Sequence, residues 1–467
     1  MKEEFIMTRR FWFQGKTPIA FCPDSSEPLV FRHYQAEAEI TVQINGGKVT
    51  KTMAEWLRFA GCHWHTALDG GADPFGGPTL LREWNIGDDP LAVARQRIDA
   101  MFELMGLLGI KHWTFHTLDL IEEGANFAET KQRLMALLPY VKQRLKETGI
   151  KVLWVTAKLF AANRYMNGAM TGTEPDIWIE AGAQIKLAID IAHELDAAGV
   201  VFWGGREGYE TLLNTMIGLE LENLATMLRA AVNYKAKIGF KGQFYIEPKA
   251  QEPTTHQYDY DVATVVGFLR DYALDGEFMV NFEPNHGSLA KHTTAHEMAM
   301  INCCNVFGSI DANQGTETVG WDTDEFPCNL ETAVVVMLEV LKNSGFTTGG
   351  LNFDAKLRRA STALDDLFMG FIMAMDTYAA ALKIAARIIN DGILAEMVQR
   401  RYCKWSNTAN GVKIANGDMS LEDCEELTER FETHPVAESG HAEFFKTVWA
   451  AYLRGDAVIP KPTQYQD

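Results

Sequence analysis

The feature that most limits the possible folds of this chain is a recurrence of short apolar runs, rich in β-branched and aromatic residues. Most of these runs are followed by a longer amphipathic stretch, such as ETAVVVMLEVLKNSG at 331–345. Strands that alternate with helices at this interval predict parallel βαβ units. Eight such units favour a closed (β/α)₈ barrel, the TIM-barrel fold, over an open sheet. The predicted strands lie at 61–66, 110–116, 151–156, 199–204, 242–247, 277–283, 306–311 and 349–354.

Polar and aromatic side chains stand at the ends of these predicted strands. In such a barrel the carboxyl ends of all strands meet at one mouth, where active sites lie. A single aspartate there is more often a cap for the next helix than a ligand. Carboxylates that end consecutive strands, however, would gather negative charge at a cost too high to bear without cations. The barrel mouth therefore predicts a metal site. The strand-end residues are His116, Thr156, Trp203, Glu247, Glu283, Asp311 and Asp354.

Further ligand candidates follow the strand ends at short spacing. Lys249 lies two residues after Glu247, so both side chains leave the strand on one side and the amine can reach a group bound at the metal. The other candidates mix oxygen and nitrogen donors, which suits a second cation. A cluster of carboxylates with one imidazole is enough for two adjacent sites that share a bridging carboxylate. Its further members are Glu283, His286, Asp322, Asp324 and Asp354.

The composition excludes several other classes of function. A formal net charge of −19 argues against nucleic acid or an anionic membrane as a partner, because both select basic proteins. The N-terminus lacks the features of a secretory signal, and no apolar run approaches the length of a membrane span. The seven cysteines form no CxxC pair, which favours reduced thiols over a disulfide framework. We therefore expect a cytoplasmic protein whose partner is a small molecule.

The domain organisation follows from length and from a change in sequence character. A chain of 467 residues can form one large core and an accessory domain. We predict a catalytic barrel with an N-terminal extension over 1–389. The sequence then becomes more polar and irregular, and we predict a C-terminal helical arm over 390–467 that packs on another subunit.

Several of these segments resemble the xylose isomerases, and the likeness covers essentially the whole chain. It is carried by IEPKAQEPTTHQYDYD, VFWGGREGYETLLNT, GSIDANQG, GWDTDEFP and GGLNFDAKLRR, and it is closest to the longer-chain subgroup of that family. The resemblance implies an intramolecular oxidoreductase that interconverts an aldose and a ketose by a metal-assisted 1,2-hydride shift. D-xylose to D-xylulose, or D-glucose to D-fructose, is the implied reaction. A homotetramer is implied as well.

The resemblance also implies a cofactor and its ligands, namely two divalent cations (Mg²⁺, Mn²⁺ or Co²⁺). The first would be held by Glu247, Glu283, Asp311 and Asp354. The second would be held by Glu283, His286, Asp322 and Asp324.

Substrate contacts are implied in the same way. Lys249 would polarise the oxygen at the carbonyl end of the sugar, and His116, oriented by Asp119, would assist ring opening. Thr156 would contact a distal hydroxyl, and Phe75 resembles a residue that family members donate into a neighbouring subunit's site. Apolar walls would come from Trp64, Trp154 and Trp203, although each alone is equally compatible with an ordinary core aromatic.

The chain departs from the family pattern at loops around the mouth and not at the predicted ligands. Lys158 is the boldest departure, because the family has a neutral amide there. We expect its charge to shift sugar preference or to lower metal affinity by repulsion. The positions whose effect on rate is open are Thr117, Val155, Lys158, Gln314 and Thr316.

Two other functions remain as alternatives. Two-metal hydrolases also use carboxylate–histidine clusters in barrels, although this chain lacks a clear basic cluster for a phosphate. A catalytically weak sugar-binding relative would fit the loop departures. HTTAHE at 292–297 lacks the HExxH order of a zinc helix and is interpreted as a solvated helix start, and GGREG at 204–208 fits neither nucleotide-binding spacing.

Overall fold

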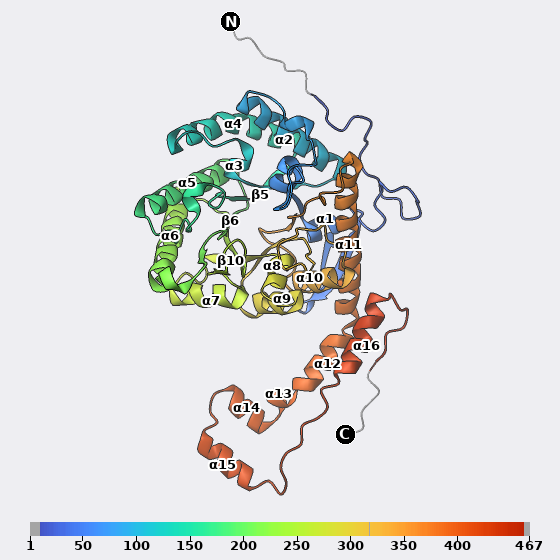
Figure 1. Ribbon diagram of the computed structural model, residues 1–467. Coiled ribbons are helices and arrows are strands. Elements are labelled where there is room, and N and C mark those ends of the chain that lie inside the picture. The colour runs from blue at the N-terminus through green and yellow to red at the C-terminus, as the bar shows by residue number, and fades with distance from the viewer. Residues whose placement is uncertain (1–9, 317, 462–467) are drawn as a thin grey trace. The chain divides into compact units, whose positions relative to one another are not determined.

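Eight parallel strands close into a barrel in the computed structural model, which describes residues 10–316 and 318–461. Each strand pairs with the next barrel strand along the chain, and the last pairs with the first, as in a (β/α)₈ barrel. Figure 1 shows the helices as an outer layer around these strands. The barrel strands are β3 (Phe59–Cys62), β4 (His112–His116), β5 (Lys151–Thr156), β6 (Gly199–Trp203), β8 (Gln243–Glu247), β10 (Phe278–Phe282), β11 (Phe307–Asp311) and β12 (Leu351–Phe353).

The surrounding helices begin and end at local signals. At the start of α2, the side chain of Asp89 accepts a hydrogen bond from the backbone N–H of Leu91, and Gly109 ends that helix in the left-handed region with a φ of 75°. The helices are α1 (Met53–Leu57), α2 (Pro90–Leu108), α3 (Thr117–Leu120), α4 (Phe127–Thr148), α5 (Pro175–Glu194), α6 (Ile217–Ile238), α7 (Val262–Asp271), α8 (Pro284–Leu289), α9 (Thr294–Cys303), α10 (Leu330–Lys342) and α11 (Leu364–Asp391). Shorter elements are the antiparallel pair β7 (Gly208–Tyr209) and β9 (His256–Gln257), and helical turns at Trp64–Leu68, Glu83–Asn85, Asn163–Tyr165 and Leu212–Asn214.

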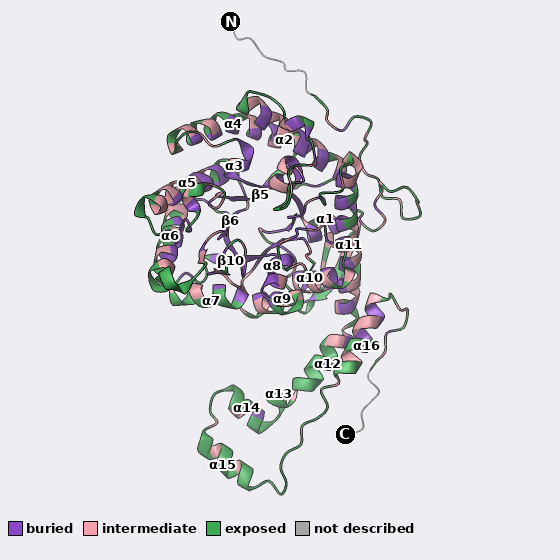
Figure 2. Cartoon of the chain, in the orientation of Figure 1, coloured by how far each residue is buried: buried purple, intermediate pink, exposed green. Residues whose placement is uncertain are grey.

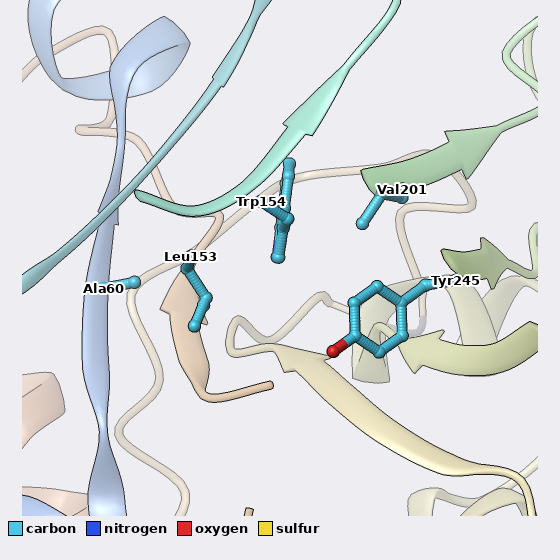
Figure 3. Packing of buried hydrophobic residues seen from close by; sticks show 5 residues of the cluster. All are labelled: Ala60, Leu153, Trp154, Val201 and Tyr245. Atoms are coloured by element: carbon cyan, nitrogen blue, oxygen red, sulfur yellow. The ribbon is translucent and has the colours of Figure 1, made fainter. Parts of the chain in front are cut away.

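The barrel interior is filled by side chains from several strands. Figure 3 shows the fully buried ring of Tyr245 facing Trp154 and Val201, with Leu153 and Ala60 beside them. The Tyr245 hydroxyl lies 2.5 Å from Thr348 Oγ1, so its polar end has a partner. Glu247 lies two residues further along β8 and therefore on the same side of the strand, toward its carboxyl end. The aromatic layer thus forms a floor below the strand-end carboxylates.

Glycines let the strands approach the Tyr245 ring. A Cβ atom added at Gly308 would lie 2.5 Å from the carbonyl oxygen of Val280 and 2.7 Å from the ring. One added at Gly349 would collide with the backbone of Gly308. Since backbone atoms cannot yield as a flexible side chain can, only glycine fits these two positions without a shift of the strands.

Seven of the predicted strands are confirmed to within a few residues, whereas the first is misplaced. That strand was expected at 61–66, but β3 ends at Cys62 and Trp64–Leu68 forms a helical turn. The reason is tertiary. Trp64 Nε1 donates to Asp354 Oδ1 at 2.8 Å, and His65 Nε2 lies 3.0 Å from the same oxygen, so both side chains turn toward the mouth and away from the strand ladder.

The chain divides into two compact units, with the boundary inside α11. The larger contains Lys51–Ala381 and the residues before Ile40, and the smaller contains Ile40–Thr50 and the residues from Leu382 onward. The predicted boundary at residue 390 and the inter-subunit role of the arm stay predictions. The remaining elements are β1 (Glu39–Ile44), paired with β2 (Gly47–Thr52), and the helices α12 (Ile393–Tyr402), α13 (Lys404–Asn407), α14 (Ala409–Ala415), α15 (Leu421–Glu429) and α16 (Ala442–Leu453).

Within the smaller unit, polar contacts join the β1–β2 hairpin to the helical part. Asn390 Oδ1 accepts from the backbone N–H of Gln43 at 2.8 Å, and Asn390 Nδ2 donates to the carbonyl of Thr41 at 2.9 Å. Most of the surface of α13, α14 and α15 is exposed, as Figure 2 shows.

Helix α11 qualifies the expectation that no apolar run reaches the length of a membrane span. By length and composition alone it passes that test, and the most apolar part of it is 61% buried. Buried core helices commonly have the same length and hydropathy, so this is weak evidence for a membrane span.

We predict that Gly349→Ala will destabilise the barrel, while Gly267→Ala, the same change on the exposed surface of α7, will not. The added methyl at Gly349 meets backbone, and overpacking of this kind costs about 1–3 kcal/mol. The methyl at Gly267 meets nothing within 4 Å, and alanine favours a helix over glycine by about 0.5–1 kcal/mol. Thermal unfolding of both variants checks this, and equal shifts in Tm would contradict it.

Candidate functional site

Six carboxylates and one imidazole gather at the carboxyl ends of β8, β10, β11 and β12 and in the loop around Asp322. Glu283 is the common member of three groups whose ligand atoms all lie within 4.8 Å of one another. The partners of Glu283 in these groups are Asp311 with Asp354, Glu247 with His286, and Asp322 with Asp324. The structure therefore brings together all seven metal ligands that the sequence suggested.

Amide side chains hold the deepest carboxylates in place. Asn281 Nδ2 donates to Glu247 Oε2 at 2.7 Å and to Asp311 Oδ2 at 2.9 Å. Asn352 Nδ2 donates to the other oxygen of Asp311 at 2.7 Å, and Asn313 Nδ2 donates to Glu283 Oε1 at 2.6 Å. The sequence analysis missed these amides. The sequence did contain a signal for them, because each amide stands two residues from a predicted ligand. Where the chain is extended, side chains two residues apart point to the same side.

Mutual repulsion raises the pKa of the central carboxyl groups. Burial, together with the charge of Asp354, raises the pKa of Asp311 to about 8. The pKa values of Glu247 and Glu283 lie well above their usual range for the same two reasons, burial first and neighbouring carboxylates second. These groups cannot all ionise together without a compensating positive charge. A set of buried oxygen donors with one imidazole suits hard divalent cations.

Basic side chains compensate the other three acids, of which Asp322 is the first. Burial disfavours the ionised form of Asp322, but the charges of Lys249 and His286 hold its pKa well below its usual range. Lys249 Nζ donates to Asp322 Oδ2 at 2.8 Å and lies 5.5 Å from the centre of the Trp203 ring. The predicted proximity of Lys249 to the metal ligands is thus present.

His65 is a second member of the site that the sequence analysis did not single out. Its Nε2 atom lies 3.0 Å from Asp354 Oδ1 and 3.1 Å from Asp324 Oδ2. Burial opposes the protonation of His65, but the charges of these two aspartates raise its pKa to about 9. Lys356 Nζ also donates to Asp324 Oδ2, at 2.9 Å. The chain thus supplies positive charges of its own to Asp324 and Asp354.

At the end of β4, His116 forms a buried pair with Asp119 of α3. Asp119 Oδ2 lies 2.7 Å from His116 Nδ1 and accepts from the backbone N–H of His116 at 3.0 Å, which caps the N-terminus of the short helix α3. Lys158 Nζ donates to the second oxygen, Asp119 Oδ1, at 2.8 Å. The Lys158 ammonium is therefore paired with Asp119, and the expected effect of its charge on sugar preference or metal affinity stays a prediction.

Aromatic rings lie between the carboxylate cluster and the His116–Asp119 pair. The Trp64 ring lies 4.5 Å from the His116 imidazole, and Phe160, which the sequence analysis missed, lies 4.5 Å from Trp203, both measured between centroids. Trp154 is only 2% exposed and belongs to the barrel core. Thr156 pairs with His116 across β5 and β4, and its buried Oγ1 has no hydrogen-bond partner among the described residues.

Two further expectations concern loops. Phe75 is 82% exposed, and its ring centroid lies 6.2 Å from that of Trp321, which is also exposed.

The departures from the family pattern at Gln314 and Thr316 make hydrogen bonds within their own loop. Gln314 Oε1 accepts from two backbone N–H groups, and Thr316 Oγ1 donates to Glu325 at 2.9 Å. Thr117 and Val155 are buried.

The two rejected motifs also have structural roles. Thr293 accepts from the backbone N–H of His296 and caps α9, which confirms a helix start. Glu297 is not solvated, however, since it is 2% exposed and accepts from Val262 N and His292 Nδ1. In the glycine-rich segment, the Glu207 carboxylate accepts from the backbone N–H groups of 169–171 and so fixes the loop after β5.

Comparison with known proteins finds relatives over nearly the whole chain. The xylose isomerase of Thermotoga neapolitana is 44% identical over 453 residues, which cover 97% of this chain and 98% of that protein. The xylose isomerase of Enterobacter sp. strain 638 is 43% identical over 431 residues, covering 92% and 96% respectively. No protein-family model matches the chain.

Solved structures with a similar arrangement include 3-keto-D-glucoside 4-epimerase from E. coli, with 11% identity and a TM-score of 0.46 over 61% of this chain and 94% of that one. D-psicose 3-epimerase from Clostridium cellulolyticum gives 11% identity and a TM-score of 0.44 over 71% and 99%. Likenesses at this level do not bear on the function of this chain, and the fold assignment rests on the closed barrel itself.

We predict that the metal-free protein loses stability as the pH rises from 6.5 to 8. The raised pKa of Asp311, about 8, means that the folded state keeps a proton that the unfolded chain has released near pH 4, so this stabilisation disappears as the pH approaches 8. His65, with its pKa raised to about 9, acts in the same direction above pH 6.5. The lowered pKa of His63, about 4, acts in the opposite direction, but only below pH 6.5.

Thermal unfolding after treatment with a chelator, with and without added Mg²⁺, measures this effect. Because cations compete with protons for the carboxylates, Mg²⁺ should raise Tm more at pH 8 than at pH 6.5. The variant Glu283→Gln, which removes the common ligand, should lose most of this metal-dependent increase. A metal effect that is independent of pH would contradict the prediction.

Proposed function

The chain belongs to the xylose isomerase family and is an aldose–ketose isomerase, and from this premise we propose that it converts D-xylose to D-xylulose, and D-glucose to D-fructose, by a metal-assisted 1,2-hydride shift. The observation that carries the proposal is the set of three ligand groups that share Glu283, facing the His116–Asp119 pair. A two-metal hydrolase is not favoured, because relatives matched over nearly their full length are named xylose isomerases.

The donor set fits two divalent cations. In the proposal the first is held by Glu247, Glu283, Asp311 and Asp354, and the second by Glu283, His286, Asp322 and Asp324. The raised pKa values of the central carboxyls support this, because they show that ionising these acids needs more positive charge than the chain supplies. Mg²⁺, Mn²⁺ and Co²⁺ all accept such ligands. When bound, the cations would polarise the sugar oxygens as Lewis acids and hold its hydroxyls in position.

Ring opening is assigned to His116. Opening breaks the C1–O5 bond, moves the proton of the O1 hydroxyl to O5 and leaves an aldehyde at C1. The Nδ1 atom of His116 is engaged by Asp119, so Nε2 is the nitrogen available to carry this proton. The Trp64 ring against the imidazole supports a fixed orientation of the histidine.

Lys249 acts in the second step. In our proposal its ammonium donates a hydrogen bond to the substrate oxygen at the carbonyl end and so stabilises the negative charge that develops there. The hydride leaves C2 for C1, the O2 hydroxyl gives up its proton, and O1 gains one. Trp64, Phe160 and Trp203 would exclude water from the reacting carbons.

The hydride route is favoured over an enediol because an enediol needs a base beside C2. The acids at the carboxyl ends of β8, β10, β11 and β12 all belong to the proposed ligand groups, and His116 is assigned to the ring oxygen.

We further propose a cytoplasmic homotetramer that acts on a small-molecule sugar and has neither nucleic acid nor membrane as a partner. The exposed Phe75 and the exposed surface of α13–α15 support contacts between subunits. None of the cysteines is in a disulfide among the described residues, which agrees with a reducing compartment.

Substrate deuterated at C2 distinguishes the two mechanisms. We predict that the label is found at C1 of the ketose, and that product formed in heavy water gains almost no deuterium there. NMR of the product measures both. Extensive solvent label at C1 would indicate the enediol route, and absence of ketose from either sugar would refute the proposed function.

Phe75→Ala should weaken sugar binding, seen as a raised KM, with little change in Tm, because the side chain contributes little to the fold of its own subunit. Sedimentation of the wild type together with an activity measurement upon dilution provides the control. A fully active monomer would contradict a role for Phe75 in a neighbouring site.

A further inference from the structure

Lys158 makes a contact that neither metal binding nor the proposed substrate contacts require. From its geometry we propose that Lys158 is a positioning residue for His116: it fixes the carboxylate of Asp119, which in turn fixes the imidazole that opens the sugar ring. This inference deepens the proposed function and rests on it.

The three side chains form a continuous line. Lys158 Nζ lies 2.8 Å from Asp119 Oδ1, and Asp119 Oδ2 lies 2.7 Å from His116 Nδ1. Each carboxylate oxygen thus has its own side-chain partner, and the backbone N–H of His116 is a further donor to Oδ2. A carboxylate held at both oxygens cannot rotate about its terminal bond, so the acceptor presented to His116 keeps one direction.

Burial makes this pair more important than a surface ion pair. The Asp119 side chain is fully buried, that of His116 is 9% exposed and that of Lys158 is 24% exposed. Burial disfavours the ionised form of Asp119, but the charges of His116 and Lys158 hold its pKa well below its usual range. A neutral amide at position 158, which the family pattern has, could not supply this charge. Asp119 would then depend on His116 and backbone groups alone.

The other charged groups near Asp119 do not replace Lys158. Arg97 donates its Nε–H to Asn85 at 2.8 Å, and its interaction with Asp119 is an electrostatic one through space. His63 is buried, and burial lowers its pKa to about 4, so it is neutral at pH 7. Lys158 is therefore the cation that hydrogen-bonds to Asp119 within the part of the chain that the structure describes.

The segment after β5 holds His116 from two directions. Phe160 packs edge-on to the imidazole with a centroid distance of 5.4 Å, while Lys158 acts through Asp119. The Lys158 ammonium also lies 5.9 Å from the centre of the Phe160 ring. Both contacts come from one short segment, so the orientation of His116 depends on where that segment lies.

A double-mutant cycle tests the proposal. Lys158→Met removes the charge but keeps most of the apolar part of the side chain, and His116→Asn removes the group through which Lys158 is proposed to act. In the otherwise wild-type protein, Lys158→Met should lower kcat for D-xylose about tenfold, a fraction of what general acid–base catalysis contributes. In the His116→Asn background it should have less than about a twofold effect, because residues that act as a unit are not additive.

Three measurements separate positioning from a structural role. Lys158→Arg should restore most of the activity, because it retains the charge. Mn²⁺ affinity should stay unchanged in Lys158→Met, whereas tighter binding would mean that the lysine repels the metal and would overturn the proposal. The matched control is Lys186→Met, which removes a lysine paired with Asp190 at 2.7 Å on the surface of α5 and should leave kcat unchanged.

Equal losses from Lys158→Met in both backgrounds, or no loss in either, would overturn the inference. Failure of the proposed function would look different, because the wild-type protein would then form no ketose.

Discussion

Electrostatic repulsion among the buried carboxylates at one end of the barrel is the constraint on which the rest of the structure depends. Parallel strands bring their carboxyl ends to the same place, so acids that end neighbouring strands must lie close together. Desolvation makes each charge costly, and the neighbouring carboxylates add to that cost. The protein answers with amides at the deepest acids and with basic side chains at the rim, and Glu283, at the centre, contacts an amide and His286.

That central position explains why divalent cations fit here. The amides of Asn281, Asn313 and Asn352 orient carboxylate oxygens without neutralising them. Lys249, Lys356 and His65 neutralise only Asp322, Asp324 and Asp354. The central acids Glu247, Glu283 and Asp311 have raised pKa values and so keep protons at a pH where an ordinary carboxyl has lost them. A site arranged in this way binds metal in competition with protons, which links its occupancy to pH.

The mouth has two halves with different chemistry, and Trp64 connects them. One half, on β8 and β10–β12, carries the carboxylates, and the other, on β4 and β5, carries His116 and the segment with Lys158. The Trp64 indole donates to Asp354 through Nε1 and packs its ring against His116. Trp64 makes both contacts from the helical turn that follows β3 and not from the strand predicted at 61–66. Trp64 thus contacts one residue of each half.

The sequence alone determined the eight βα units, because apolar periodicity is local and each unit carries its own signal. It also determined the seven carboxylate and imidazole candidates, because residues at the ends of parallel strands must converge. Tertiary structure decided what touches them. Tertiary contacts ended β3 at Cys62. They also paired His65 with Asp324 and Asp354, and Lys158 with Asp119, which are residues distant in sequence. A local pattern shows that a lysine lies near the mouth, but only the packed barrel determines which of several acids it meets.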